Sequence, residues 1–187
     1  MDPAEILSLP SAAWEAEYLE DTSLRRLVLE HYDQEHLGIR RYLTFLGVDR
    51  ETGQEIVQES FLKLHEHLLG GGDRTNLRAW LYRVAHNLAR NTQTSFRATK
   101  IDSLPDVTVS GDIAARSTSA EEELLAAERA ERLRQAMGQL SAAQRECLML
   151  RTQGLKYREI AEVLKLSVST VGENVQRGLD KLKELLP

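Results

Sequence analysis

Apolar residues recur every three or four positions along most of the chain, the spacing that places them on one face of an α-helix. In the first half this pattern predicts helices at 11–20 and 23–46, a third that follows Thr52 and a fourth that Asn76 caps. Three glycines at 70–72 end the third helix, because glycine favours flexible, non-helical backbone. The first half of the chain is therefore predicted to be helical throughout.

The helical pattern stops at 98–120, a segment rich in Ser, Thr, Asp and Ala that also holds Pro105. Such a composition is typical of a linker between domains. Helical spacing resumes near 119, and Ser141 with Gln144 forms the S-x-x-Q pattern of a capping box at the start of a following helix. The sequence thus predicts a second helical unit after the linker.

The last two predicted helices, 157–164 and 168–186, are separated by only three residues. Helices joined by so short a turn cross steeply, which leaves the second one projecting as in a helix-turn-helix. The apolar side of this second helix is expected to comprise Val171, Val175, Leu179 and Leu182. An ordinary helical hairpin within a bundle is the alternative.

The leucine-rich stretches, interrupted by few prolines, favour an all-α fold. A length of 187 residues allows one compact domain or two small ones. We expect two small helical domains joined by a flexible linker. The boundaries are an acidic N-terminal extension at 1–20, a first domain at 21–97, the linker at 98–120 and a second domain at 121–187.

The net charge of −5 hides an uneven distribution. Residues 1–35 hold nine acidic and two basic residues, whereas 74–100 hold six basic residues and no acidic one. Three aromatic residues lie among these basic residues: Trp80, Tyr82 and Phe96. The mixture suits nucleic acid, because basic side chains neutralise phosphates and aromatic rings stack on nucleobases. A solvated helix face with aromatic residues in the core is the alternative.

Other chemistry has little support in the residues. The single cysteine, Cys147, excludes an internal disulfide and a cysteine-based zinc cluster. Neighbouring histidines lie five or two residues apart, not the three or four that align two metal ligands on a helix. With no P-loop or GxSxG motif, we expect no metal, no cofactor and no enzyme activity. Without a signal peptide or a run of about 18–20 apolar residues, we expect a cytoplasmic protein that does not insert into a membrane.

Two blocks carry the most specific motifs of the chain. The first comprises QEIVQESFLKLHEHL and NLRAWLYRVAHNLARN, and the second is LSAAQRECLMLRTQGLKYREIAEVLKLSVSTV. They resemble regions 2 and 4 of the extracytoplasmic-function (ECF) group of the sigma-70 family, the bacterial RNA polymerase initiation factors. The blocks follow the order of the family and together cover most of 24–187. The resemblance implies a sigma factor that binds core RNA polymerase and directs promoter-specific transcription initiation, without covalent chemistry of its own.

The resemblance also implies which residues meet each partner. Region 2 of the family docks on the clamp helices of the polymerase β′ subunit, and the matching residues are Glu55, Gln58, Glu59, Leu62 and Lys63. The next helix holds the −10 promoter element and its melted strand, and the matching residues are Arg78, Tyr82, Arg83, Asn87, Arg90 and Asn91. Trp80 lies in the same helix, two residues before Tyr82, so the two side chains cannot point in the same direction. We favour Trp80 as the one that packs in the core.

Region 4 of the family sits on the polymerase β flap and reads the −35 element with the second helix of its helix-turn-helix. The matching residues are Ser169, Thr170, Glu173, Asn174, Arg177 and Lys181. Family members usually carry basic residues where this chain has Gly172, Glu173 and Asn174. Two phosphate contacts would then be missing, which weakens DNA binding, whereas Glu173 could accept from cytosine and Asn174 could pair with adenine. The sequence leaves open whether −35 recognition is weakened or redirected.

Further hypotheses concern partners and regulation. An anti-sigma factor is a common partner in the family, although this sequence does not identify one. The acidic segment 1–35 could fold over the basic segment 74–100 and reduce DNA binding in the free protein, with a solvated surface helix as the alternative. Two other functions stay open: a stand-alone helix-turn-helix regulator that binds duplex DNA without polymerase, and a helical adaptor whose basic face meets an acidic protein.

Overall fold

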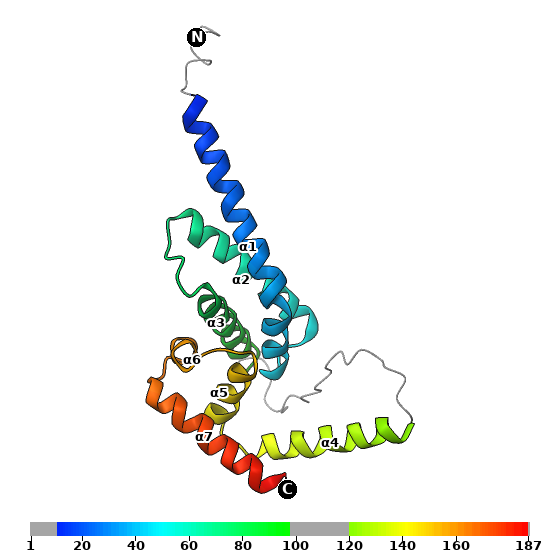
Figure 1. Ribbon diagram of the computed structural model, residues 1–187. Helices are drawn as coiled ribbons and strands as arrows, with labels where there is room; N and C mark the ends of the chain where they lie inside the picture. Colours follow the sequence, from blue (N-terminus) through cyan, green and yellow to red (C-terminus); the bar gives the residue numbers. More distant parts are fainter. Residues whose placement is uncertain (1–10, 98–119, 187) are drawn as a thin grey trace.

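The computed structural model describes residues 11–97 and 120–186, which form seven α-helices and no strand (Figure 1). The helices are α1 (Ser11–Phe45), α2 (Arg50–Leu69), α3 (Leu77–Arg97), α4 (Ala120–Gly138), α5 (Ala142–Thr152), α6 (Tyr157–Leu164) and α7 (Val168–Leu185). The all-α class expected from the sequence is confirmed. Residues 1–10 and 98–119, which hold part of the expected N-terminal extension and nearly all of the expected linker, lie outside the described residues.

The first helix is continuous, so the prediction of two helices at 11–20 and 23–46 is wrong. Residues 21–22 between them are Asp and Thr, neither of which breaks a helix as Pro or Gly does. Figure 1 shows the N-terminal half of α1 extending beyond the rest of the described structure. Its C-terminal half packs against α2 and α3.

The second helix begins earlier than predicted because Asp49, rather than Thr52, is its N-cap. The Asp49 carboxylate accepts hydrogen bonds from the backbone N–H groups of Glu51 (3.1 Å) and Thr52 (3.0 Å). These bonds favour the ionised carboxylate and hold the pKa of Asp49 below its usual range. A single local side chain therefore sets the start of α2.

Asn76 precedes α3 as expected, but its side chain does not cap the helix. Its backbone is left-handed, with φ of 57°, and its amide Nδ2 donates a hydrogen bond to Glu162 Oε2 of α6 at 3.1 Å. The backbone carbonyl of Asn76 accepts from Trp80 N–H at 3.1 Å, so the helical hydrogen bonds still begin at this residue. The expected side-chain cap is instead a contact between two distant segments.

The last four helices contain the local features that the sequence predicts. Ser141 and Gln144 form a reciprocal capping box at the start of α5. Lys165, with a left-handed φ of 55°, ends α6, and the Ser167 hydroxyl accepts from Thr170 N–H at 3.0 Å to cap α7. These caps form the short turn that sets α7 across α6.

The apolar side of α7 differs from the prediction at one position. Val171 and Val175 are buried, but Leu179 is 40% exposed. Gly178 is buried instead, and a Cβ there would lie 2.8 Å from Leu148 Cδ1 of α5. The close approach of α5 and α7 at this glycine turns the helix so that Leu179 faces outward.

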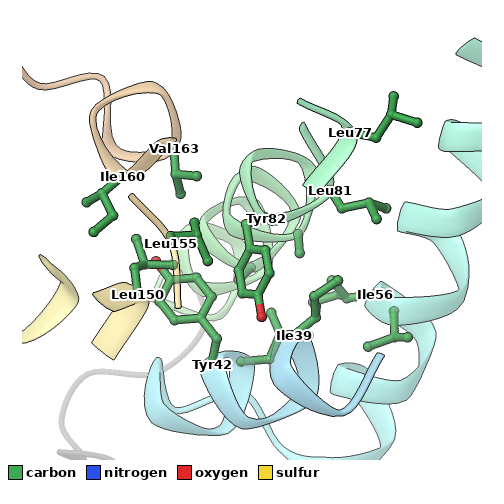
Figure 2. Packing of buried hydrophobic residues seen from close by; sticks show 14 of the residues in the cluster. Ile39, Tyr42, Ile56, Leu77, Leu81, Tyr82, Leu150, Leu155, Ile160 and Val163 are labelled. Atoms are coloured by element: carbon green, nitrogen blue, oxygen red, sulfur yellow. The ribbon is translucent and has the colours of Figure 1, made fainter. Parts of the chain in front are cut away.

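The two groups of helices, α1–α3 and α4–α7, share one apolar cluster. Figure 2 shows Tyr42 of α1 and Tyr82 of α3 beside Leu150 and Leu155, with Ile160 of α6 nearby. All five side chains are fully buried. Because α3 also packs along α6, residues far apart in the sequence form one core, and the division into domains at 21–97 and 121–187 stays a prediction.

Candidate functional site

One polar surface follows the exposed side of α2. It comprises the five residues expected to meet polymerase, all exposed: Glu55, Gln58, Glu59, Leu62 and Lys63. Leu62 is 64% exposed, while Glu59 and Lys63 form a solvent-exposed ion pair at 3.4 Å. Val57, Phe61 and Leu64 of the same helix are buried in the core, as the helical spacing predicts. An apolar side chain among charged ones on an open helix face is suited to docking another protein.

A shallow cavity of about 210 Å³ lies beside this surface, between α1 and α2. It is lined by Tyr32, His36, Arg40, Gln54 and Val57. The Tyr32 ring stacks on His36 at a centroid distance of 4.6 Å and meets Phe61 edge-on at 5.0 Å. Although its ring packs on Phe61, 37% of Tyr32 is exposed. The spacing of four between Tyr32 and His36 is the one sequence signal for this aromatic pair.

On α3 the structure buries Tyr82 in the core and leaves Trp80 partly exposed, the reverse of the expectation. Tyr82 is fully buried, so its side chain is not accessible to DNA in this conformation, and its assignment to DNA contact stays a prediction. Burial raises the pKa of the Tyr82 hydroxyl well above its usual range, with the charge of Glu35 acting in the same direction. Trp80 packs against the edge of the core but stays partly exposed. Because Trp80 and Tyr82 are two positions apart in an α-helix, their side chains point about 200° apart around the helix axis, so only one of them can enter the core.

Trp80 lines a second cavity of about 260 Å³ that the sequence does not predict. The other lining residues are His67, Asp73, Thr75, Asn76, Arg83 and Glu162. The Trp80 ring stacks on His67 at a centroid distance of 4.9 Å. Five of the seven residues come from the loop before α3 and from α3 itself, His67 comes from α2, and Glu162 comes from α6.

The loop at 70–76 is held against the wall of this cavity. His67 Nε2 donates to the Asp73 backbone carbonyl at 3.0 Å, which requires a proton on Nε2. A Cβ at Gly72 would lie 2.2 Å from His67 Cε1, so only glycine allows this approach. Hydrogen bonds from the hydroxyl and the backbone N–H of Thr75 keep the pKa of Asp73 below its usual range. The glycine run, predicted only as a helix end, thus shapes the cavity.

The remaining −10 candidates on α3 differ in exposure. Asn87, Arg90 and Asn91 are exposed and Arg83 is half-buried. Arg78 is engaged elsewhere: its Nε lies 2.9 Å from Glu35 Oε1 of α1, and its guanidinium donates to the backbone carbonyls of Gln153 and Gly154 after α5. The ion pair with Glu35 joins the acidic segment 1–35 to the basic segment 74–100 through charge, and residues 1–10 lie outside the described part of the chain.

The −35 candidates lie on α7, and most of them bond within their own helix. Glu173 and Arg177 form an exposed ion pair at 3.1 Å, and Asn174 Nδ2 donates to the Thr170 carbonyl at 2.9 Å. The Ser167 hydroxyl is hydrogen bonded to those of Ser169 at 2.8 Å and Thr170 at 2.7 Å. Lys181 points to the other side, where its Nζ donates to the Gln139 carbonyl at 2.6 Å. The structure therefore groups the first five candidates and separates Lys181 from them.

Gly172 lies between these residues and faces the ring of Tyr157. A Cβ at this position would lie 3.8 Å from the ring, an ordinary van der Waals contact. Tyr157 itself is 39% exposed and lies under the guanidinium of Arg151, 5.8 Å from the ring centroid. No neighbour within the described structure therefore requires a glycine at position 172.

The side chains of His86 and Cys147 are buried. His86 Nδ1 is hydrogen bonded to the Tyr42 hydroxyl at 2.8 Å, and burial, with the charges of Arg90 and Lys165, lowers the pKa of His86 to about 4. Burial raises the pKa of the Cys147 thiol to about 11, as expected of an unreactive cysteine.

Metal binding and membrane insertion have no counterpart in the described parts of the chain. Residues 11–97 and 120–186 contain no group of three His, Cys, Asp or Glu side chains that could hold a metal ion. Among the same residues, no helix combines the length and the apolar character needed to cross a bilayer.

The all-helical fold packs the helix-turn-helix α6–α7 against α3, whose arginines are not matched by any acidic residue in that helix, and such an arrangement is suited to nucleic acid. Residues 130–182 match the family model described as Sigma-70, region 4. The chain is 35% identical to the RNA polymerase sigma factor SigZ of Bacillus subtilis, over 83% of this chain and 84% of that protein. The chain therefore belongs to the sigma-70 family of RNA polymerase sigma factors, and within it to the extracytoplasmic-function group.

Solved structures of similar fold support the architecture. CnrH, solved in complex with the cytosolic domain of CnrY, has a TM-score of 0.59 and 22% identity, covering 90% of this chain and 95% of CnrH. The sigma factor RpoE of Bartonella quintana, solved with the anti-sigma factor NepR, has a TM-score of 0.53 and 22% identity, covering 84% of this chain and 97% of RpoE. These likenesses extend across both groups of helices.

Proposed function

We propose that this chain is an initiation factor that recruits core RNA polymerase to promoters and captures the melted strand at the −10 element. The observation that carries the proposal is the pair of exposed surfaces, one on α2 and one on α7, in a chain that belongs to the sigma factors. The mechanism is recruitment and strand capture in the cytoplasm. No step requires covalent chemistry by this chain.

In this proposal, the exposed surface of α2 docks on the clamp helices of the polymerase β′ subunit. Gln58 and Leu62 lie one helical turn apart at its centre, so both can meet the same partner helix. The neighbouring cavity between α1 and α2 extends the contact to Tyr32 and His36. An exposed leucine and two stacked aromatic rings would supply the buried centre of the interface, with the charged residues at its rim.

The cavity beside Trp80 receives an unpaired base of the −10 element. Its volume of about 260 Å³ is below the usual range for drug-sized ligands and is suited to a single ring system. Trp80 and His67 offer flat faces for stacking, while Arg83, with Asn87, Arg90 and Asn91 along α3, supplies polar and cationic contacts to the backbone. The aromatic contact thus comes from Trp80 in place of Tyr82.

The helix-turn-helix reads the −35 element through the first turns of α7, and the group α4–α7 rests on the β flap. Four of the five grouped candidates lie in the first two turns of α7, where a recognition helix enters the major groove, and Arg177 lies one turn after Glu173. Glu173 and Arg177 neutralise each other in the structure, so sequence preference would depend on whether DNA separates this pair. An anti-sigma factor is a further partner, which the solved complex of the similar sigma factor RpoE with the anti-sigma factor NepR supports.

The decisive experiment measures binding of the full chain to purified bacterial core RNA polymerase, with the housekeeping sigma factor as competitor. The test variant is Gln58→Ala with Leu62→Ala, both exposed, so that the fold is preserved. A matched control is Gln34→Ala with Leu37→Ala, which removes the same side chains from an exposed part of α1 that does not line the cavity. We expect competable binding that the test variant weakens by about tenfold or more and the control leaves unchanged.

The alternatives predict different results. A stand-alone helix-turn-helix regulator would bind duplex DNA and show no binding to core polymerase. A helical adaptor would show no preference for single-stranded over duplex DNA. Failure of the folded, inhibitor-free chain to bind core polymerase would therefore contradict the proposed function.

A further inference from the structure

One aromatic ring of the helix-turn-helix faces a position that has no side chain. Tyr157, the first residue of α6, lies beside Gly172 of α7, where an added Cβ would lie 3.8 Å from Cε2 and 3.9 Å from Cδ2 of the ring. Figure 1 shows α6 beside the N-terminal end of α7, the part of that helix that holds most of the −35 candidates. No side chain at position 172 therefore covers the Tyr157 ring on the surface assigned to the −35 element.

A neighbouring cation holds this ring in place. The Arg151 guanidinium lies over the Tyr157 ring, 5.8 Å from its centroid. Arg151 is itself anchored, because its Nη1 donates to the Leu155 carbonyl at 3.0 Å. Even so, 39% of Tyr157 is exposed. A ring that is fixed by its neighbours and still open to solvent is a preformed apolar contact surface.

The charges around the ring favour duplex DNA as the partner of this surface. Lys156 and Arg158 adjoin Tyr157 in the chain, and both are exposed, as is Arg151. Three cations around one apolar ring allow phosphates to be neutralised on either side of a groove contact. The ring therefore lies where the edges of base pairs and the DNA backbone would both be within reach.

The polar candidates of α7 are less ready to read a base. Glu173 is paired with Arg177 at 3.1 Å, and Asn174 donates to the Thr170 carbonyl at 2.9 Å. Each of these groups must exchange an existing bond for one to a base, so the net gain is small. The Tyr157 ring loses only water when it meets an apolar group. In the major groove that group is the 5-methyl of thymine.

We propose that the Tyr157 ring, left open by Gly172, reads the 5-methyl group of a thymine in the −35 element. The inference rests on the proposed function, because it requires α7 to enter the major groove of that duplex. A long side chain at position 172 would lie over the ring and remove the contact. The glycine thus has a role in recognition that the packing of the helices does not give it.

The first test uses the holoenzyme formed by the full chain and purified core RNA polymerase. Duplexes that it binds are selected from a random-sequence library and sequenced, and thymine should recur at one position of the −35 element. In one selected duplex, each thymine of this element is then replaced in turn by uracil, which deletes only the methyl group. We expect one replacement to weaken binding about fourfold, the factor for burial of one carbon group.

Variants then assign this difference to the ring. Tyr157→Ala should bind the thymine and uracil duplexes equally, whereas Tyr157→Phe keeps the ring and should keep the difference. Gly172→Lys should lose the difference while binding both duplexes more tightly at low salt, because its side chain covers the ring and adds a cation. The matched control is Val168→Ala, which shortens another exposed apolar residue of the helix-turn-helix and should keep the difference. Thermal unfolding checks the folding of each variant.

The outcomes separate this contact from the proposed function. A holoenzyme that binds promoter duplexes without a recurrent thymine, or that binds every uracil duplex as tightly, would overturn the contact alone. A methyl dependence that survives in Tyr157→Ala or in Gly172→Lys would also overturn it, and its loss in Val168→Ala would assign the reading to Val168. Failure of the full chain to form a holoenzyme would instead contradict the proposed function.

Discussion

The two helices expected to meet DNA, α3 and α7, are organised in different ways. On the first half of α7, Glu173 pairs with Arg177 and Asn174 bonds to the Thr170 carbonyl, so these contacts stay within about one turn of the helix, while Lys181 further along bonds to the Gln139 carbonyl. On α3, Arg78 and His86 bond to residues from distant segments. The polar surface of α7 is thus a property of the helix, whereas that of α3 depends on the surrounding fold.

This difference determines what each helix tolerates. A helix whose polar groups pair locally can separate from its neighbours and keep its surface, as a recognition helix must. A helix whose groups bond to distant partners changes its surface when those partners leave. Substitutions on α3 should therefore affect stability and conformation, and those on α7 should affect mainly DNA binding.

The largest expected effect comes from Tyr82 at the centre of the shared core. Tyr82→Ala removes a fully buried ring and leaves a cavity, so the free energy of unfolding should fall by about 3–5 kcal/mol. Denaturant unfolding checks this, with Tyr82→Phe as the control that keeps the ring. A loss below about 1 kcal/mol would show that Tyr82 is accessible and restore it as a DNA-contact candidate.

Stability should next depend on pH through His86. The folded protein holds this ring neutral down to about pH 4, whereas the unfolded chain protonates it near its ordinary pKa of about 6.5. The unfolded state thus binds more protons between these values, and the free energy of unfolding should fall as the pH drops from about 6.5 to 4. In His86→Gln the free energy of unfolding should depend less steeply on pH across this range. A pH dependence as steep as that of the unmodified chain would contradict this role for His86.

Two glycines of α7 offer a sharper comparison within one helix. Gly172→Ala should stabilise the protein by up to about 1 kcal/mol, because alanine favours helix and the site is open. Gly178→Ala should destabilise it by about 1–3 kcal/mol, since its Cβ would press on Leu148. Thermal unfolding of the pair checks the prediction. Equal stabilisation by both changes would show that α5 and α7 are less closely packed than in the structure.

The smallest expected effect concerns the local ion pair of α7. Glu173→Ala removes an acidic group and releases Arg177 to meet a phosphate, so duplex DNA should bind a few-fold more tightly. The slope of log affinity against log salt should steepen by about 0.9, the value for one added phosphate contact. Binding titrations at several salt concentrations check this, with Glu184→Ala as the control. Weaker binding confined to sequences with a particular cytosine would instead indicate direct base reading by Glu173.

The local features were the most predictable from the sequence. The capping box of Ser141 and Gln144 and the short turn before α7 depend on residues within four positions of one another, and both occur as predicted. The errors at Thr52 and at 21–22 concern which local signal ends or begins a helix. Family membership also followed from the sequence, because two ordered motifs are far more specific than either one.

Tertiary structure alone decided which side of each helix faces inward and what its polar groups bind. The sequence places Trp80 and Tyr82 on opposite sides of α3, but only the packing of α1, α2 and α6 around this helix selects Tyr82 for the core. The bonds of Arg78 and Asn76 join segments more than 70 residues apart, with separations of 75, 76 and 86 positions. Helical spacing and capping act between neighbours along the chain, whereas burial depends on which distant surfaces meet. That is why the cavity beside Trp80 and the contacts of Arg78 and Asn76 become visible only in the folded protein.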